Sequence, residues 1–217
     1  MKIKYNKDYY ENGLAKGISG YENYRWIPEL TYPMAYSMCN ALKLKKKDKV
    51  LEYGCAHGFL VKALNDFKID TYGVDISKYA LSKVDSEIKK KTSLLKNNNI
   101  KNSLKKMNIK SKFDYIISKD VFEHIEEKDL KKILREMSKI TKKLFVVVPL
   151  GDGGKYRIES YHGDKTHIIA ENENWWKKLF SENKFKLKSF SYNIEGIKDK
   201  WYTVNKKGNG FFKLISR

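Results

Sequence analysis

An apolar strand that runs directly into a glycine-containing turn constrains this chain most strongly. Residues 50–60 read VLEYGCAHGFL, and such a turn before a helix places backbone N–H groups beside a ligand. The dinucleotide fingerprint needs small residues at its first, third and sixth positions, which here are Gly54, Ala56 and the bulky Phe59. Phosphate loops of the Walker type need Lys-Ser/Thr after the last glycine, but Gly58 precedes Phe-Leu. The turn therefore disfavours both dinucleotide-dependent oxidoreductases and nucleoside triphosphatases.

Strands and helices alternate on both sides of this turn, which is typical of an α/β fold. We expect strands at 50–53, at TYGVD ending at Asp75, weakly at 92–95, at 113–118 and at LFVVVPL. Helices are expected from the turn to about residue 66, from 78 to about 90 and from 127 to 140, whereas the polar stretch 96–112 indicates no element. The pattern predicts a Rossmann-like, mostly parallel sheet with helices on both faces.

The two ends of the chain depart from this rhythm. Residues 1–27 have no regular period but many Tyr residues, and a helix interrupted near Pro33 is expected to follow. Beyond residue 150 come a loop, a short helix in which Trp175 and Trp176 serve packing, and KFKLKSFSYNI and GFFKLISR as an antiparallel hairpin. We predict one domain over residues 1–217, with 1–45 as an N-terminal lid and helix segment and 46–217 as the cofactor-binding core.

Composition excludes several classes of protein. The net charge of +19 comes almost entirely from lysines scattered along helices, whereas nucleic-acid sites favour arginine, so a nucleic-acid partner is disfavoured. No segment is apolar enough for a membrane span or a signal peptide, and a cytoplasmic protein is expected. Cys39 and Cys55 form no disulfide framework, and no Cys or His pair has zinc-ligand spacing.

The glycine turn resembles the first motif of class I S-adenosylmethionine (SAM)-dependent methyltransferases. Glu52, Gly54, Ala56 and Gly58 form the pattern acidic-x-Gly-x-small-x-Gly. The resemblance implies that the turn passes close to the methionine and ribose parts of SAM and that the acidic residue holds the ammonium group. Glu52, Gly54, Cys55 and Gly58 are accordingly expected to bind the cofactor.

Two further sequence motifs follow in the order expected for that family. Asp75 ends the next strand about twenty residues later, where a carboxylate can accept both ribose hydroxyls, and Ile76 would flank the adenine. The segment FDYIISKDVFEHI is similar to the family's fourth strand and places Lys119 and Asp120 beside the cofactor and the acceptor. The family's adenine-binding acidic residue after the third strand has no counterpart except the asparagines at 97–99 (Asn97, Asn98 and Asn99).

Histidines and one carboxylate are the candidates for catalysis, because a hydroxyl acceptor must lose a proton. His167 is favoured, since its segment DKTH resembles the D-x-T-H element that many small methyltransferases bring to the acceptor. His124 is a second candidate, with a packing role as its alternative, and Asp120 is the third. His162 is interpreted as a loop residue in water, and His57 is expected to face solvent or cofactor.

The N-terminal segment supplies groups that could close over the cofactor. Tyr24, Arg25 and Trp26 lie there, and Arg25 could pair with the methionine carboxylate or an anionic acceptor. The segment 118–121 lacks the N-P-P-Y of adenine methyltransferases, and a lone Asp120 does not make a magnesium site, so no metal is predicted.

The stretch ENGLAKGISGYENYRWIPELTYPMA (residues 11–35), followed by VLEYGCAHGFLVKAL (residues 50–64), resembles small methyltransferases found with bacterial surface-polysaccharide biosynthesis. This extends the resemblance over most of the chain. These methyltransferases include enzymes that act on sugar hydroxyls or on the O-methyl phosphoramidate of capsules. We therefore expect a small-molecule acceptor and S-adenosylhomocysteine as product; a sugar needs a base, whereas a phosphoramidate needs cations such as Arg25, Lys119 or Arg157. An RNA methyltransferase using the basic surface and a non-catalytic SAM-binding protein remain alternatives, and the sequence does not define the oligomeric state.

Overall fold

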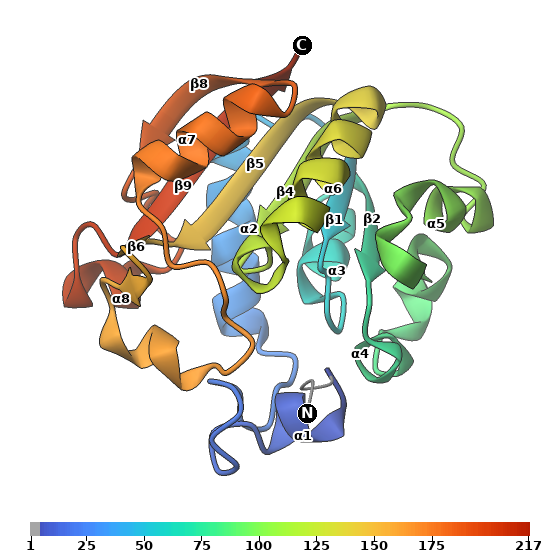
Figure 1. The fold of residues 1–217 in the computed structure, drawn as a ribbon. Coiled ribbons are helices and arrows are strands. Elements are labelled where there is room, and N and C mark those ends of the chain that lie inside the picture. The colour runs from blue at the N-terminus through green and yellow to red at the C-terminus, as the bar shows by residue number, and fades with distance from the viewer. Residues whose placement is uncertain (1–4) are drawn as a thin grey trace.

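In the computed structural model, which describes residues 5–217, a seven-stranded sheet forms the centre of the molecule (Figure 1). The strands follow the order β3-β2-β1-β4-β5-β9-β8. Their bounds are β1 Lys49–Tyr53, β2 Asp70–Asp75, β3 Thr92–Leu94, β4 Phe113–Lys119, β5 Thr141–Pro149, β8 Phe185–Ser191 and β9 Asn209–Ser216. A separate two-stranded sheet pairs β6 (Gly151–Asp152) with β7 (Lys155–Tyr156).

The first five strands are parallel and the last two are antiparallel to their neighbours. Val50 is paired with Tyr115 in the parallel β1–β4 ladder, and Val148 is paired with Gly210 in the antiparallel β5–β9 ladder. Strand β9 also pairs with β8 in antiparallel fashion. The predicted parallel sheet with a C-terminal antiparallel hairpin is therefore confirmed.

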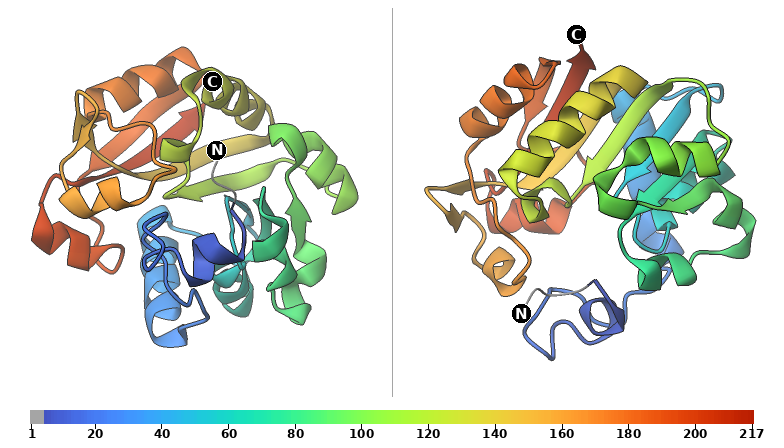
Figure 2. Two further views of the ribbon diagram at one scale, coloured as in Figure 1. Left: turned by 60° about the horizontal axis from the view of Figure 1, so that its bottom comes forward. Right: turned by 45° about the vertical axis from the view of Figure 1, so that its right-hand side comes forward.

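Helices cover both faces of the sheet, as Figure 2 shows. Leu104 of α5, Leu134 of α6 and Trp176 of α7 belong to the hydrophobic cluster on one face. Met38 of α2 and Leu64 of α3 belong to the cluster on the other face. The helices are α1 Lys7–Glu11, α2 Pro28–Leu42, α3 Phe59–Asp66, α4 Lys78–Ser82, α5 Ile100–Lys106, α6 Glu127–Ile140, α7 Glu173–Glu182 and α8 Asp199–Val204. None of the helices within residues 5–217 has the length and apolar character needed to span a membrane.

Helix α2 runs without interruption through Pro33, contrary to the prediction. Pro33 removes one intrahelical N–H group, but Ala35, Met38 and Leu42 keep the following turns buried against the sheet. Tertiary packing therefore outweighs the local cost of proline here.

In the segment between β2 and β4, one predicted helix is shorter than expected and another helix was not predicted. The helix expected over 78–90 ends at Ser82 and is followed by a 3₁₀ helix, Ser86–Lys91, because the Asp85 side chain accepts the Glu87 N–H at 2.9 Å and starts a new turn. The stretch 96–112 contains α5, whose Ile100 and Leu104 are buried one helical turn apart. Two apolar residues among many polar ones do not form a hydrophobic pattern strong enough to indicate a helix.

The N-terminal segment, described from residue 5 to residue 27, lies across the carboxyl ends of the parallel strands, below the sheet in Figure 1. On one side of these strands, Ser77 Oγ donates to the Tyr5 carbonyl at 2.6 Å. On the other side, the Lys165 N–H donates to the Ile18 carbonyl at 3.1 Å. The segment therefore bridges the two halves of the strand-end crevice and forms its outer wall.

Candidate functional site

A cavity of about 880 Å³ opens where the strand order reverses between β1 and β4. At such a reversal the connections leave on opposite faces, so a crevice forms outside the carboxyl ends of the strands. Its volume lies within the range of roughly 300–1,000 Å³ common for small-molecule sites. Ten of the twelve predicted site residues line it: Tyr24, Arg25, Glu52, Gly54, Cys55, Asp75, Ile76, Lys119, Asp120 and His124.

The two glycines of the turn have different positions. Gly54 lines the cavity with a φ of +83°, and a Cβ there would lie 2.4 Å from a Val121 methyl carbon. Gly58 has a φ of +75° at the N-cap of α3, where a Cβ would meet Ile88 instead. Gly58 is thus outside the cavity lining, and its predicted contact with a cofactor has no support in this geometry.

Glu52 places a buried carboxyl group at the end of β1. Its side chain is almost fully enclosed, and Oε2 has no hydrogen-bond partner among residues 5–217. Burial raises the pKa of Glu52 to about 8, although Lys119 opposes the shift. A buried acceptor without a donor is costly. An ammonium group entering the cavity would satisfy it.

Asp75 holds its carboxylate in a fixed orientation at the end of β2. Its Oδ2 accepts the Ala56 N–H and its Oδ1 accepts the Ser77 N–H, both at 2.7 Å. Burial raises the pKa of Asp75, and these N–H donors oppose that shift. A carboxylate has about four acceptor sites, so two remain for vicinal hydroxyls. The neighbouring Ile76, 48% exposed, offers an apolar surface on the same cavity.

Asp120 lies between two lysines directly after β4. Lys119 Nζ is 2.6 Å from Oδ2 and Lys198 Nζ is 2.5 Å from Oδ1. Although burial alone would raise it, the pKa of Asp120 is held well below its usual range by the two ammonium groups. Lys198 was missed in the sequence, because it follows Asp120 by 78 residues in a segment with no recognisable motif.

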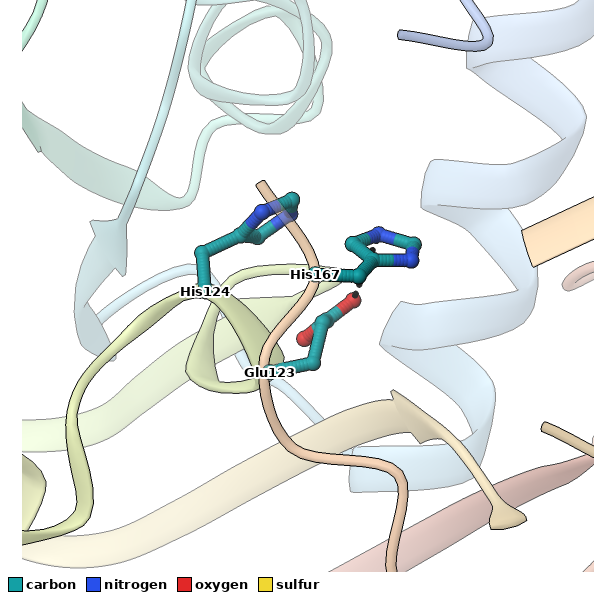
Figure 3. Close-up of side chains that lie close together, drawn as sticks. All are labelled: Glu123, His124 and His167. Atoms are coloured by element: carbon teal, nitrogen blue, oxygen red, sulfur yellow. Dashed lines mark ion pairs between the residues drawn. The ribbon is translucent and has the colours of Figure 1, made fainter. Parts of the chain in front are cut away.

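His124 and His167 lie together beside Glu123, as Figure 3 shows. The ring centroids are 4.6 Å apart, and His167 Nε2 lies 4.0 Å from Glu123 Oε1. His124 Nδ1 is 2.7 Å from Thr166 Oγ1, and His167 Nδ1 is 2.8 Å from the Tyr161 carbonyl oxygen. Neighbouring groups therefore fix the orientation of both rings.

The three side chains differ in exposure to the cavity. His124 lines it, whereas His167, the favoured base, lines a second cavity of about 200 Å³ together with His162. His162 is not simply in water, since its Nε2 accepts the Tyr156 N–H at 3.1 Å. Burial lowers the pKa of His124 to about 4, lowers that of His167, and raises that of Glu123 well above its usual range. Both imidazoles are consequently neutral near pH 7.

The N-terminal segment adds an aromatic wall to the cavity. The tyrosines of this segment that line the cavity are Tyr5, Tyr9, Tyr10, Tyr21 and Tyr24. Tyr9 Oη donates to Asp164 Oδ2 at 2.8 Å and so ties this wall to the loop before His167. His57 was expected to face solvent or cofactor, but it is 4% exposed and outside the lining, because the rings of Tyr10 and Tyr24 pack against it. That expectation was wrong.

Other predicted groups lie apart from the cavity. Arg157 pairs with Asp152 at 2.7 Å and with Glu173 at 3.0 Å. Asn97 and Asn99 are not in the lining, and Leu95 occupies that part of the wall, while the side chain of Asn98 lies outside the described part of the structure. The predicted packing of the tryptophan pair is confirmed, with Trp176 fully buried and Trp175 packed against the same cluster.

Acidic groups outnumber basic ones in the cavity lining. The bases are Arg25, Lys119 and Lys165, and the acids are Glu22, Glu52, Asp75, Asp120, Glu126 and Asp129. The positive charge of the chain is therefore not concentrated at this site. A polyanion would meet more repulsion than attraction there.

Comparisons with known proteins agree with this architecture. The sequence profile of a family described as methyltransferase domain matches residues 26–197. A SAM-dependent methyltransferase from Clostridium acetobutylicum has a similar structure, with 15% identity, a TM-score of 0.61 and coverage of 88% of this chain and 92% of that one. The PH0226 protein of Pyrococcus horikoshii has 15% identity and a TM-score of 0.61, with coverage of 97% and 96%. The CcbJ methyltransferase of Streptomyces caelestis has 10% identity and a TM-score of 0.60, with coverage of 86% and 90%. No curated protein sequence matches the chain.

Proposed function

Since the chain belongs to the methyltransferase domain family and is a SAM-dependent enzyme, we propose that it methylates a hydroxyl group of a small, sugar-like acceptor. The acceptor is of the kind used in bacterial surface-polysaccharide biosynthesis. One observation carries the proposal. One cavity brings together three groups. At the end of β1, a buried oxygen of Glu52 has no hydrogen-bond partner among residues 5–217. At the end of β2, the Asp75 carboxylate is oriented by a backbone N–H group, and His124 lies on the wall beside them.

The residues present fit SAM, which supplies an electrophilic methyl group on a sulfonium. Glu52 would accept from its ammonium group, and the free lone pairs of Asp75 would accept from the ribose hydroxyls. Ile76 and Leu95 would flank the adenine, and the absence of a Cβ at Gly54 lets the turn pass close to Val121 and the ligand. Tyr24 and Arg25 would close the outer side.

The remaining wall suits a neutral polyhydroxylated acceptor. Tyrosine rings offer flat apolar faces to sugar C–H groups, and their hydroxyls offer hydrogen bonds. Asp120, held by Lys119 and Lys198, is a fixed hydrogen-bond acceptor for a hydroxyl group of the substrate. The protein's task in methyl transfer is to align the acceptor oxygen and exclude water, which an enclosed aromatic wall favours.

The cavity is less suited to an anionic phosphoramidate. Arg157 is paired with Asp152 and Glu173 outside the cavity, and carboxylates outnumber cations in the lining. The same imbalance argues against RNA as the acceptor. Both remain distinguishable outcomes of the experiment below.

The test is a methyl-transfer assay with purified protein and SAM. Nucleotide-linked sugars, phosphoramidate-bearing sugars and total RNA are offered separately, and S-adenosylhomocysteine and the mass of the acceptor are measured. We expect one added methyl group on a free sugar hydroxyl. Methyl incorporation into RNA, or onto the phosphoramidate alone, would replace the proposed acceptor with another.

A further inference from the structure

Glu123, His124 and His167 each offer a ligand atom, and these atoms all lie within 4.8 Å of one another (Figure 3). Two come from the turn after β4 and the third from the loop that begins after β7. No spacing in the sequence indicated the cluster, because 43 residues separate its two histidines. Their convergence is a property of the folded chain alone.

The hydrogen bonds leave the outer nitrogen of each imidazole free. His167 Nδ1 faces the Tyr161 carbonyl, which only accepts, so this nitrogen carries the proton. Thr166 Oγ1 donates to Asp164 Oδ1 at 2.6 Å, so it accepts from His124 Nδ1. Each Nε2 therefore keeps its lone pair. This is the arrangement of metal-binding histidines, whose other ring N–H is held by a carbonyl or a polar group.

No described residue compensates for the burial of the Glu123 carboxyl group. It is fully buried, and neither of its oxygens has a hydrogen-bond partner anywhere in residues 5–217. Figure 3 shows the group directed toward His167, 4.0 Å away, which is beyond hydrogen-bonding distance. A buried carboxyl that faces two imidazoles without bonding to either lacks a partner at that point.

We propose that Glu123, His124 and His167 bind a divalent first-row transition metal ion, through the two Nε2 atoms and the carboxylate. Two imidazoles and one carboxylate form the protein ligand set of many catalytic zinc sites. Bonds of about 2.0–2.1 Å would bring the ligand atoms to about 3.4 Å from one another, so binding draws the side chains inward. We use Zn²⁺ as the probe.

Three protein ligands would leave a coordination position open, and His124 is the ligand that also lines the main cavity, where the acceptor would lie. This step rests on the proposed function. A hydroxyl bound at that position would have its pKa lowered by the ion, so that it can release its proton to solvent water near neutral pH. The acceptor class is then a hydroxyl compound that can coordinate a metal.

The experiment is a calorimetric titration of the full chain with ZnCl₂, after dialysis against a chelator and in the absence of SAM and acceptor. Wild type is compared with His167→Ala and with the nearly isosteric Glu123→Gln. His162→Ala is the matched control, because His162 lies on the same loop but outside the cluster. Thermal unfolding of every variant checks that it is folded. Co²⁺ absorption in the visible range reports independently on coordination.

We expect one Zn²⁺ per chain in wild type and His162→Ala, and an affinity weakened at least about a hundredfold in His167→Ala and Glu123→Gln. No binding to wild type would overturn the proposal, as would equal binding by all four proteins. A SAM titration of the same metal-free wild type separates the two proposals. SAM binding without Zn²⁺ binding removes the metal site and leaves the proposed function standing.

Discussion

The backbone carbonyl oxygen of Glu123 accepts a hydrogen bond from the N–H of Ile168 at 2.8 Å. This bond joins the turn after β4 to a loop 45 residues later in the chain. His124 follows Glu123 in the chain and His167 precedes Ile168, so the bond also holds the backbones of the two histidines close together. A link of the main chain thus assembles side chains that no local motif could bring together.

Replacing Lys198 by alanine should lower the free energy of unfolding by about 2 kcal/mol at pH 7, because Asp120 keeps only Lys119 as a partner in a partly buried site. Lys200→Ala, at an exposed position of α8, the helix that follows Lys198, should change this free energy by less than about 0.5 kcal/mol. Urea unfolding measures both. The difference from wild type should shrink below about pH 4, where a carboxylate with a depressed pKa begins to lose its contribution.

Glu52→Gln should stabilise the protein at alkaline pH. The pKa of Glu52 is about 8 in the folded chain, so between its unfolded value and pH 8 the folded form binds a proton that the unfolded form releases. Stability then falls as the pH rises through this window. The free energy of unfolding of the variant should exceed that of wild type by a few kcal/mol at about pH 8.5, and this difference should disappear toward about pH 4.5. A constant gap between pH 5 and 8.5 would contradict the assigned pKa shift.

Gly54→Ala combines a strained φ with a steric overlap at Val121. We expect a loss of about 2–3 kcal/mol in stability together with weaker SAM binding. Gly153→Ala separates the two causes, since Gly153 also has a positive φ, +56°, but an added Cβ meets nothing within 4 Å. Gly153→Ala should lower the free energy of unfolding by only about 1 kcal/mol and leave SAM binding unchanged. Similar effects of both substitutions would argue against a close approach at Gly54.

Tyr9→Phe removes the hydroxyl that links the aromatic wall to Asp164. The loss of this hydrogen bond, worth about 1–1.5 kcal/mol, should speed SAM dissociation roughly five- to tenfold while leaving the site residues in place. Stopped-flow displacement measures this rate. Tyr36→Phe, at a position on α2 that is 62% exposed, should dissociate like wild type. An unchanged rate in Tyr9→Phe would mean that the N-terminal segment does not retain the ligand.

The parallel sheet and the meeting of Glu52, Gly54 and Asp75 at one cavity were predictable from the sequence because local patterns encode them. Apolar strands, the glycine turn and Asp75 each act within a few residues of their own position, and the long apolar period of α6 fixed its bounds. Helix α5 was not predicted because only two of its buried residues, Ile100 and Leu104, are apolar.

The side-chain pairs formed by residues far apart in the chain could not be predicted in the same way. The partnership of Asp120 with Lys198 and that of His124 with His167 span 78 and 43 residues, and both depend on how loops pack in the folded chain. His57 was misjudged because its burial comes from tyrosines of the N-terminal segment, which have no period to place them.

The central claim is that the cavity at the ends of β1 and β2 binds SAM. Calorimetric titration of wild type with SAM and S-adenosylhomocysteine should give a Kd on the order of 1–100 µM. Asp75→Ala should weaken both ligands about 10- to 100-fold, whereas Asp70→Ala, at the opposite end of β2, should bind like wild type. Failure of wild type to bind either ligand, or unchanged binding by Asp75→Ala, would contradict the account.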